Sequence, residues 1–593
     1  MIDSTLQQDS RARSNTASLL ALFLFLFLGL MAHGLFFPQE WIILGFTFSI
    51  FSLLSHSYLK SYFPIREEAP LGLTDSLFLV MVCFSLLGVV HAVKVKDGLI
   101  EALRWGIFWF VYRLGGQIYS NETAKKRLTQ SVEGLAMLVA CIGWVPWVTK
   151  VAGRLSSVFG YPNAMATFLG VALLLYPRRK SVRIFLGISL LATGSRAGVG
   201  LFLLVLMGQQ FFLYRGKKTS IHRRKLWAIL LGIVGAVLML VYNRPAWENL
   251  TSWGFSSSSW QERLVYYKDG ISLAWNAGGL PQAGGWLAFP TVQHFPYWTS
   301  DPHSSFIHIL LNQGAIGIIC VGIWSVFTLA QARKTWLKKC IAPPSTVRAE
   351  ATKAEVRVWG ALLFLALHSL VDADFSFGAL GLLFWMLFGS FVKRDEPPRP
   401  FYSRWNSSTV YFSSKGMFFL SLILCLVCGS ALLNPALIEK EKSLNMQARL
   451  GFEQNPTKSI ALWNLSLNWD QTQITTRREQ AELLLKRGNT DAGLKAVQEV
   501  LQWQPFELEA YEWAQSIAWD AAEIQRHTHP EIATKLYRWV EGVPKNIEER
   551  VAILTLSERL LWQGYREFQA SPHIKLLAEY ARQRQLTQPL PGT

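Results

Sequence analysis

The chain has 593 residues, of which 51% are hydrophobic and 13% aromatic, and its formal net charge is +18 at pH 7. Its mean hydropathy is +0.23, and the apolar residues gather into runs of about 20, which excludes a soluble multidomain protein. The Lys and Arg residues lie mainly in short segments between these runs, as membrane topology requires, so the positive charge does not indicate nucleic-acid binding. We therefore expect an all-α, polytopic helical membrane protein.

The apolar runs predict about thirteen membrane-spanning helices. The first run is long and has no small-x-small cleavage site before the next one, so we expect a span and not a cleaved signal. The predicted spans are, to within a few residues, 17–37, 41–57, 72–93, 98–118, 131–149, 163–177, 181–195, 197–214, 226–243, 303–330, 357–371, 376–392 and 416–436.

Basic segments on alternate turns set the expected orientation, because positively charged loops stay in the cytoplasm. These segments are 125–127, 178–180, 215–225, 333–357 and 393–404. The remaining turns are then extracytoplasmic, together with a long loop at about 244–302 and everything after residue 437. We expect a transmembrane domain at 1–436 and an extracytoplasmic helical domain at 437–593.

The tail is rich in helix-forming residues and contains no apolar run long enough to span a membrane. Part of it resembles a tetratricopeptide repeat, although Gly493 stands where that family usually has Ala and only one unit is clear. An ordinary helical hairpin is the alternative. The residues with the repeat spacing are Ala481, Leu485, Gly488, Leu494, Val497, Val500 and Pro505, and the nearby aromatic residues Trp503, Tyr511, Trp513 and Trp519 are expected either in the core or at a partner protein.

Three residues that carry or can take up positive charge map to the expected outer surface. Arg196 interrupts two apolar stretches, and a guanidinium at or inside a bilayer is costly unless it faces a polar site. Arg263 lies in the long loop, and His303 follows that loop at the start of an apolar helix. The alternatives are that Arg196 only extends to the lipid head groups, that Arg263 is an ordinary surface charge, and that His303 is a helix cap.

These residues belong to a series of short motifs whose order is more specific than any single member. The motifs are Gly160-Tyr161-Pro162-Asn163, Thr193-Gly194-Ser195-Arg196, Arg263, Gly284-Gly285-Trp286, His303 and Asn312-Gln313-Gly314-Ala315-Ile316-Gly317. The set resembles the O-antigen ligase and O-antigen polymerase superfamily over about residues 155–390. Two departures are Ser304, where the family usually has Asn, and Gln313, where it usually has an acidic residue; both leave the acceptor open.

The resemblance implies glycosyl transfer on the outer face of a bacterial cell membrane, without a cofactor. The donor would be an undecaprenyl-diphosphate-linked glycan, and the acceptor a hydroxyl group of a glycan, lipid or protein. A diphosphate leaving group gains negative charge as the glycosidic bond breaks, and the planar fork of arginine suits it. We therefore expect Arg196 and Arg263 to bind the diphosphate, and His303 to take the acceptor's proton.

Further residues of the motifs are expected to contact substrate, namely Asn163, Ser195 and Trp286. Aromatic side chains such as Trp286 stack on sugars, although an aromatic belt at the membrane interface is the alternative. The cluster His368, Asp372 and Asp374 is also expected at the substrate. Two carboxylates could bind a divalent cation, but they are too few for a dedicated metal site, and we expect a metal-independent reaction.

The sequence does not separate a ligase from a polymerase or from a protein O-oligosaccharyltransferase. The 368–374 cluster is similar to a part of the protein O-oligosaccharyltransferases. A repeat-like tail would suit a protein partner. From another class, a transporter or flippase for the same lipid-linked glycan would also need cationic residues. Transporters place such charges near the bilayer midplane in broken helices, whereas the candidates here map to one surface, which favours the enzyme.

Overall fold

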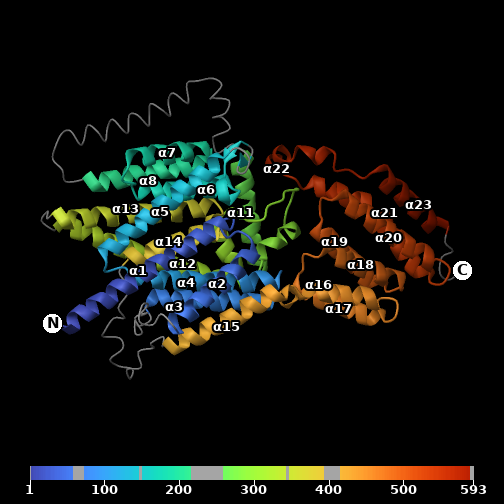
Figure 1. Cartoon of the computed structure of the whole chain (residues 1–593). Coiled ribbons are helices and arrows are strands. Elements are labelled where there is room, and N and C mark those ends of the chain that lie inside the picture. The colour runs from blue at the N-terminus through green and yellow to red at the C-terminus, as the bar shows by residue number, and fades with distance from the viewer. Residues whose placement is uncertain are drawn as a thin grey trace, which may run out of the picture. The chain divides into compact units, whose positions relative to one another are not determined.

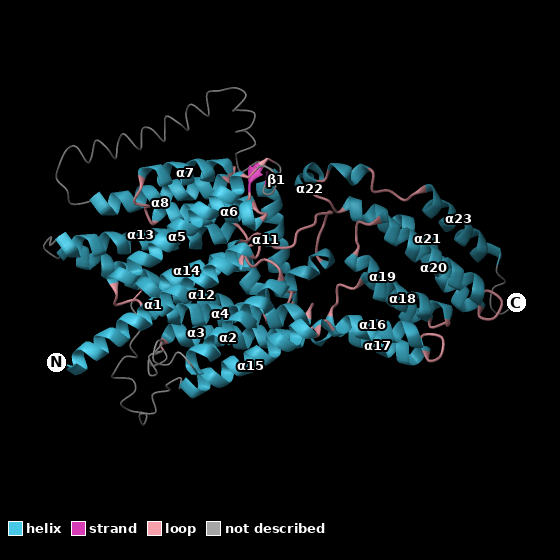
Figure 2. Ribbon diagram, viewed as in Figure 1, coloured by secondary structure: helices cyan, strands magenta, loops and turns pink. Residues whose placement is uncertain are grey.

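The computed structural model describes residues 2–57, 72–145, 150–151, 153–214, 258–341, 346–392 and 414–587. The predicted span 226–243, the basic segments 215–225 and 393–404, and residues 244–257 of the long loop lie outside the described residues. The described part of the chain is helical apart from its connecting loops and one short antiparallel hairpin, β1 (Lys150–Val151) and β2 (Arg154–Leu155) (Figure 2). The all-α class is thereby confirmed.

The chain divides into two compact units, which we describe separately. The first contains Met1–Gly88, Leu99–Ser257 and Asp301–Pro435, and the second contains Val89–Gly98, Ser258–Ser300 and Ala436–Thr593. The second unit thus joins the tail to the long loop and to a short turn between two predicted spans. This grouping was not anticipated from the sequence, which divided the chain only at 436/437.

The first unit is a bundle of long, apolar helices (Figure 1). Within it α2 packs on α15, α3 on α12, and α13 on both α6 and α8. Its helices are α1 (Ile2–Met31), α2 (Pro38–Ser57), α3 (Leu73–Leu87), α4 (Val95–Gln117), α5 (Glu122–Trp144), η2 (Ser157–Phe159), α6 (Pro162–Leu174), α7 (Lys180–Ala192), α8 (Arg196–Tyr214), α12 (Ser305–Ile341), α13 (Thr346–Val371), η4 (Asp374–Ser376), α14 (Gly378–Phe391) and α15 (Ser414–Leu433).

Among the described residues, 4 helical segments are long and apolar enough to cross a membrane. They confirm a helical membrane protein, while the expected number of spans stays a prediction. The long segments are Leu73–His91, Arg196–Leu213, Ser305–Lys334 and Lys353–Val371, and shorter apolar helices cover Thr16–Met31, Pro38–Leu54, Pro162–Leu174, Gly378–Phe391 and Phe419–Leu433.

Helix α6 of the first unit is buried along nearly its whole length, as is α14. Small residues make this possible, because they let neighbouring backbones approach closely. At Gly170, for instance, a Cβ would lie 2.5 Å from the ring of Phe364 on α13. This contact packs α6 closely against α13, and nearer the start of α6 the Thr167 hydroxyl lies 2.9 Å from His368 Nδ1 in the last turn of α13.

The helix α12 is interrupted where the sequence predicted one continuous span. Gly314 has φ 67° and ψ −164°, values that no α-helix contains. Glycine adopts such a conformation without the steric cost that a side chain would add. The Asn312-Gln313-Gly314 part of the motif series therefore marks a kink in the helix that follows His303.

The second unit consists mainly of antiparallel helix pairs, α16 with α17, α18 with α19, and α20 with α21, and α23 packs on the last pair (Figure 1). Its elements are η1 (Gly88–His91), α11 (Ser258–Asn276), η3 (Gly285–Thr291), η5 (Pro435–Leu437), α16 (Lys440–Gly451), α17 (Pro456–Trp469), α18 (Ile474–Lys486), α19 (Thr490–Trp503), α20 (Leu508–Gln525), α21 (Pro530–Ala552), α22 (Leu556–Leu561), η6 (Gln563–Arg566) and α23 (Pro572–Thr587).

The hairpin α18–α19 covers the residues that resemble a tetratricopeptide repeat. Ala481, Leu485 and Val497 are buried where the two helices meet. A Cβ on Gly493 would lie 2.6 Å from Leu485 Cδ2, which explains why glycine occupies this position. The helical hairpin is therefore observed, while its membership of the repeat family stays a prediction. Of the nearby aromatic residues, Tyr511 is core.

Candidate active site

The start of α6 carries two polar side chains to a buried carboxylate. Pro162 occupies the first turn of α6, where its fixed φ suits a helix start, and Gly160 ends η2 in the left-handed conformation. The Tyr161 hydroxyl donates to Asp372 Oδ1 over 2.7 Å, and Asn163 Nδ2 donates to Asp372 Oδ2 over 2.6 Å. Two of the predicted site residues, Asn163 and Asp372, are thus in direct contact, together with a tyrosine that sequence reasoning did not select.

His303 lies beside this carboxylate. Its Nδ1 is 3.3 Å from the Tyr161 hydroxyl oxygen and 3.7 Å from Asp372 Oδ1. The His303 side chain is 25% exposed, whereas that of Asp372 is fully buried. One side of the imidazole therefore faces a hydrogen-bonded network while the side chain remains accessible.

The backbone at His303 has an unusual conformation, which is held by a hydrogen bond to a residue of the same loop. Its φ is 52°, in the left-handed region, and its N–H donates to Asp301 Oδ1 over 2.8 Å. Helix α12 begins two residues later, and Ser304 Oγ accepts a long hydrogen bond of 3.5 Å from Ile307 N–H, so Ser304 takes the capping position. The interpretation of His303 as a helix cap is therefore not supported by its contacts.

Asp301 connects the His303 turn to a group of buried charges. Its Oδ2 accepts a hydrogen bond from Ser376 and lies 3.6 Å from His308 Nδ1. Burial alone would raise the pKa of Asp301, but the hydrogen bonds from His308 and Ser376 lower it. His308 in turn lies 3.6 Å from Glu101 Oε2. Sequence reasoning did not find this cluster.

Arg154 is a further cation of the site that the sequence did not reveal. Its Nε donates to Thr193 O over 2.8 Å, and its Nη2 donates to Asn163 Oδ1 over 2.9 Å. It therefore ties the turn before Arg196 to Asn163. The only signal in the sequence was a basic residue next to Gly153, whose φ of 74° marks the turn of the hairpin.

The structure places Ser195 and Arg196 at the beginning of α8. Ser195 is buried, and its Oγ accepts a hydrogen bond of 3.2 Å from Gly198 N–H, as a helix cap does. Arg196 is exposed. Its position at the first turn of α8, just after the Thr193 carbonyl that binds Arg154, keeps it a candidate for binding an anion.

His368 and Asp374 form a second cluster, which is completely buried. His368 Nδ1 lies 2.7 Å from Asp374 Oδ2 and 2.9 Å from Thr167 Oγ1, and Thr167 also donates to Asp374 Oδ1 over 2.9 Å. Burial raises the pKa of Asp374, and the nearby Asp372 carboxylate adds to the shift. These contacts join α6 to the turn between α13 and α14. Within the described residues, no group of three or more His, Cys, Asp and Glu side chains could hold a metal ion.

Arg263 and Trp286 belong to the second unit. Arg263 lies on α11 and is half-buried. Trp286 is only 4% exposed, and its Nε1 donates to Thr299 O over 3.0 Å. Its ring packs against Tyr266 and Phe289. Trp286 therefore serves as the core of the long loop in this structure, where the sequence analysis expected a surface for stacking sugars.

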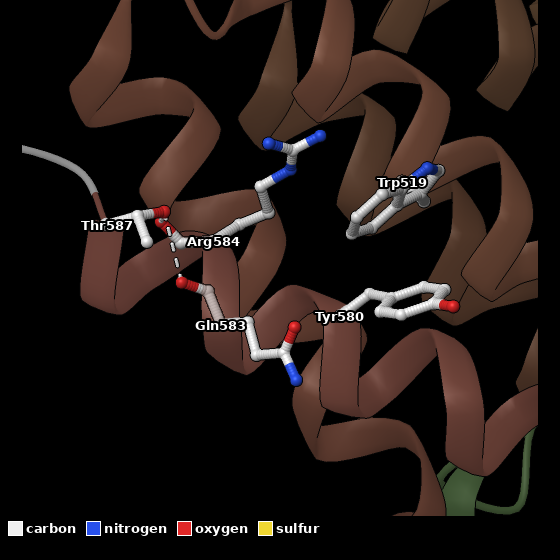
Figure 3. Close-up of a pocket in the computed structure, with 5 residues that line it drawn as sticks. All are labelled: Trp519, Tyr580, Gln583, Arg584 and Thr587. Atoms are coloured by element: carbon white, nitrogen blue, oxygen red, sulfur yellow. Dashed lines mark hydrogen bonds between the residues drawn. The ribbon is translucent and has the colours of Figure 1, made fainter.

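The second unit also has a surface hollow between α20 and α23 (Figure 3). Trp519 and Tyr580 face each other in it, and Arg584 is held by an ion pair of 3.1 Å with Glu523. The other lining residues are Gln583 and Thr587. None of the predicted site residues lies there.

By fold and site, the chain is a helical membrane protein with a polar cluster at the ends of its most buried helices. Residues 181–322 match the family model described as O-antigen ligase. This segment is less than half of the chain, and it contains Arg196, Arg263, Trp286 and His303. The match confirms the resemblance to the O-antigen ligase superfamily and supports a glycosyltransferase-type activity; it does not extend to the tail. No curated protein matches the chain.

Proposed function

We propose that this protein transfers a glycan from an undecaprenyl-diphosphate carrier to a hydroxyl group, on the outer face of a bacterial cell membrane. The observation that carries the proposal is the accessible imidazole of His303 beside Tyr161 and the buried Asp372. The family match, which includes His303, Arg196 and Arg263, supports the same chemistry.

His303 would act as the general base. A network in which His303 Nδ1–H donates to the Tyr161 oxygen, and Tyr161 donates to Asp372, leaves Nε2 with its lone pair; this tautomer follows from the hydrogen bonds and not from observed hydrogens. The acceptor hydroxyl attacks the anomeric carbon, its proton passes to Nε2, and the bond from that carbon to the diphosphate oxygen breaks. The buried carboxylate then stabilises the imidazolium.

The leaving diphosphate would need fixed cations. Arg196 is the candidate in the first unit, because Arg154 and Ser195 fix the turn from which it projects. Arg263 belongs to the second unit, and its part in the reaction rests on the family resemblance. With guanidinium groups in this role, the reaction would require no divalent cation.

Transfer of a purified lipid-linked glycan to an acceptor lipid or protein, catalysed by the purified chain, tests this proposal. Product should form in EDTA, and Arg196→Lys and Arg263→Lys should both lower the rate because lysine lacks the bidentate fork. Full activity of both variants would contradict the proposal that these arginines bind the diphosphate. Loss of activity in EDTA and its return with Mg²⁺ would contradict the proposal that the reaction needs no metal. A protein acceptor would identify a protein O-oligosaccharyltransferase.

One observation favours a second candidate function, transport of the lipid-linked glycan. The helix α12 is broken at Gly314, and next to the break Gln313 Nε2 donates to the buried Glu101 over 3.2 Å. Broken helices with buried polar groups are found at transporter sites. Movement of a labelled carrier lipid across vesicles, without transfer of its glycan, would favour this function over the enzyme.

A further inference from the structure

A short turn of the second unit, residues 89–98, is bound by the tail. Gln471 N–H donates to Val93 O over 2.8 Å, and the Gln471 side chain donates to Ala92 O over 2.7 Å. Gln471 lies in the turn between α17 and α18. This turn of the tail therefore pairs with the backbone of 89–98 as a neighbouring strand would.

The long loop binds the same turn through the backbone N–H groups of the turn, whereas the tail binds its carbonyl groups. The N–H groups of Val93 and Lys94 both donate to Ala283 O, over 2.9 and 3.1 Å. Next to it, Gly284 has φ 66°, and a Cβ there would lie 3.2 Å from Asp97 Oδ2 and 3.2 Å from Lys94 Cβ. A side chain at Gly284 would be strained by the positive φ and would lie close to Lys94 and Asp97, which favours glycine at this position.

Two ion pairs strengthen the contact between the turn and the tail. Lys94 Nζ lies 2.9 Å from Asp470 Oδ2, and Lys96 Nζ lies 2.6 Å from Glu439 Oε1. The Asp470 side chain is only 7% exposed. Burial alone would lower the pKa of Lys94, but the Asp470 carboxylate raises it. Both cations of the turn are thus paired with carboxylates of the tail.

From Gly284 the contacts continue into the part of the loop that carries predicted site residues. Trp286 lies two residues further, and its bond to Thr299 O fixes the end of the loop two residues before Asp301. Tyr266 packs on Trp286, with ring centroids 6.2 Å apart. Tyr266 belongs to α11, one turn after Arg263. The turn 89–98 therefore contacts both the tail and the loop that contains Arg263, and α19 of the tail also packs directly on η3 of the loop.

We infer that the tail is a positioning element for the long loop, and that Asp470 and Gln471 are positioning residues that act on Arg263 through residues 92–97. The inference rests on the proposed function, because it assigns the loop to donor binding. A tail that only recruited partners would not need backbone pairing with a turn that also holds the loop.

The test uses the purified full chain and compares donor KM and kcat per folded enzyme. Asp470→Asn keeps an oxygen for the Thr472 N–H, which Asp470 Oδ1 binds over 2.9 Å, but loses the charge that pairs with Lys94. We expect the donor KM to rise, by up to about 100-fold, since a small misplacement of a binding group can cost that much. Lys94→Met should have the same effect, and the double variant should be no worse than either single one.

Asp491→Asn is the matched control, because Asp491 forms an exposed ion pair with Lys535 in the same unit and should leave KM and kcat unchanged. If Asp470→Asn does not fold, Gln471→Ala removes one side-chain bond and replaces it in the comparison. An unchanged donor KM in the folded variants would overturn the inference. It would also be overturned if a variant yields less folded protein and the folded fraction has the KM of the unmodified protein.

If the unmodified protein transfers nothing, the proposed function fails, and the loop is then examined by trypsin. Lys268 on α11 is exposed. Faster cleavage there in Asp470→Asn than in Asp491→Asn supports the coupling between tail and loop, and equal rates contradict it.

Discussion

Two histidine–aspartate pairs lie near the first turn of α6, and they differ in closeness and exposure. His368 is fully buried and 2.7 Å from Asp374, while His303 is 25% exposed and 3.7 Å from Asp372. Both side chains of the closer pair are almost completely buried. The looser pair has an accessible ring, and catalytic hydrogen bonds are often long before substrate binds. In the proposed mechanism, the exposure of the His303 ring, and not the shorter distance, assigns the reaction to the His303–Asp372 pair.

The largest expected effect is on the rate of glycan transfer when His303, the accessible histidine, is replaced. His303→Ala should lower turnover by about 10²- to 10⁴-fold, because the acceptor's proton loses its base, while donor binding stays near normal. Turnover and donor affinity are measured on purified protein. Loss of donor affinity with turnover unchanged would make His303 a binding residue, and Asp301 would become the next candidate for the base.

Substitution in the buried pair should lower the stability of the protein and leave the rate of transfer nearly unchanged. His368→Ala removes the imidazole that lies 2.7 Å from the buried Asp374 Oδ2, at a cost of about 1–3 kcal/mol in the free energy of unfolding. Thermal unfolding in detergent measures this cost, and the folded fraction should turn over at nearly the normal rate. A variant that is fully stable but inactive would exchange the roles of the two pairs.

Tyr161 offers a finer test of the connection between His303 and Asp372. Tyr161→Phe keeps the ring that stacks on Phe377 but removes the hydroxyl between the imidazole and the carboxylate. We expect turnover to fall by about tenfold, within the share that one hydrogen bond to a charged group contributes. Thr167→Val, which removes a hydroxyl from the buried pair, is the control and should leave turnover unchanged.

The smallest effect concerns pH, where two buried carboxylates should behave in opposite ways. The folded-state pKa of Asp301 is lowered, so its stabilising contribution is present above the unfolded pKa and is lost on acidification. That of Asp374 is raised, so its contribution is present at low pH and is lost as the pH rises. Asp301→Asn should therefore destabilise at pH 7 and Asp374→Asn should not. The reverse order of unfolding temperatures would contradict these assignments.

Much of the site could be predicted from sequence because its residues follow local rules. Apolar runs indicated the helices, and the polar residues His303, Asn163 and Asp372 stood at their ends, where a membrane protein exposes groups to water. The family resemblance connected positions that are distant in the chain. The match to the O-antigen ligase family confirmed that resemblance in the segment that contains His303.

The remaining features depend on contacts between distant segments, which no local pattern encodes. Arg154 looked like an ordinary basic residue until the fold placed it between Thr193 and Asn163. Trp286 is a type of residue that stacks on sugars, yet in the fold its side chain is buried within the loop. The pairing of Lys94 with Asp470 joins positions that differ by hundreds of residues, so the grouping of tail and loop required the structure.

Chemical rescue tests the central claim most directly, that the His303 imidazole removes the acceptor's proton. Transfer by His303→Ala is measured with increasing free imidazole, beside His368→Ala under the same conditions. A free base can enter an accessible position but not a buried one, so turnover of His303→Ala should rise with imidazole while that of His368→Ala does not change. No rescue of His303→Ala by imidazole, in a variant that still binds the donor, would contradict the assignment of His303 as the base.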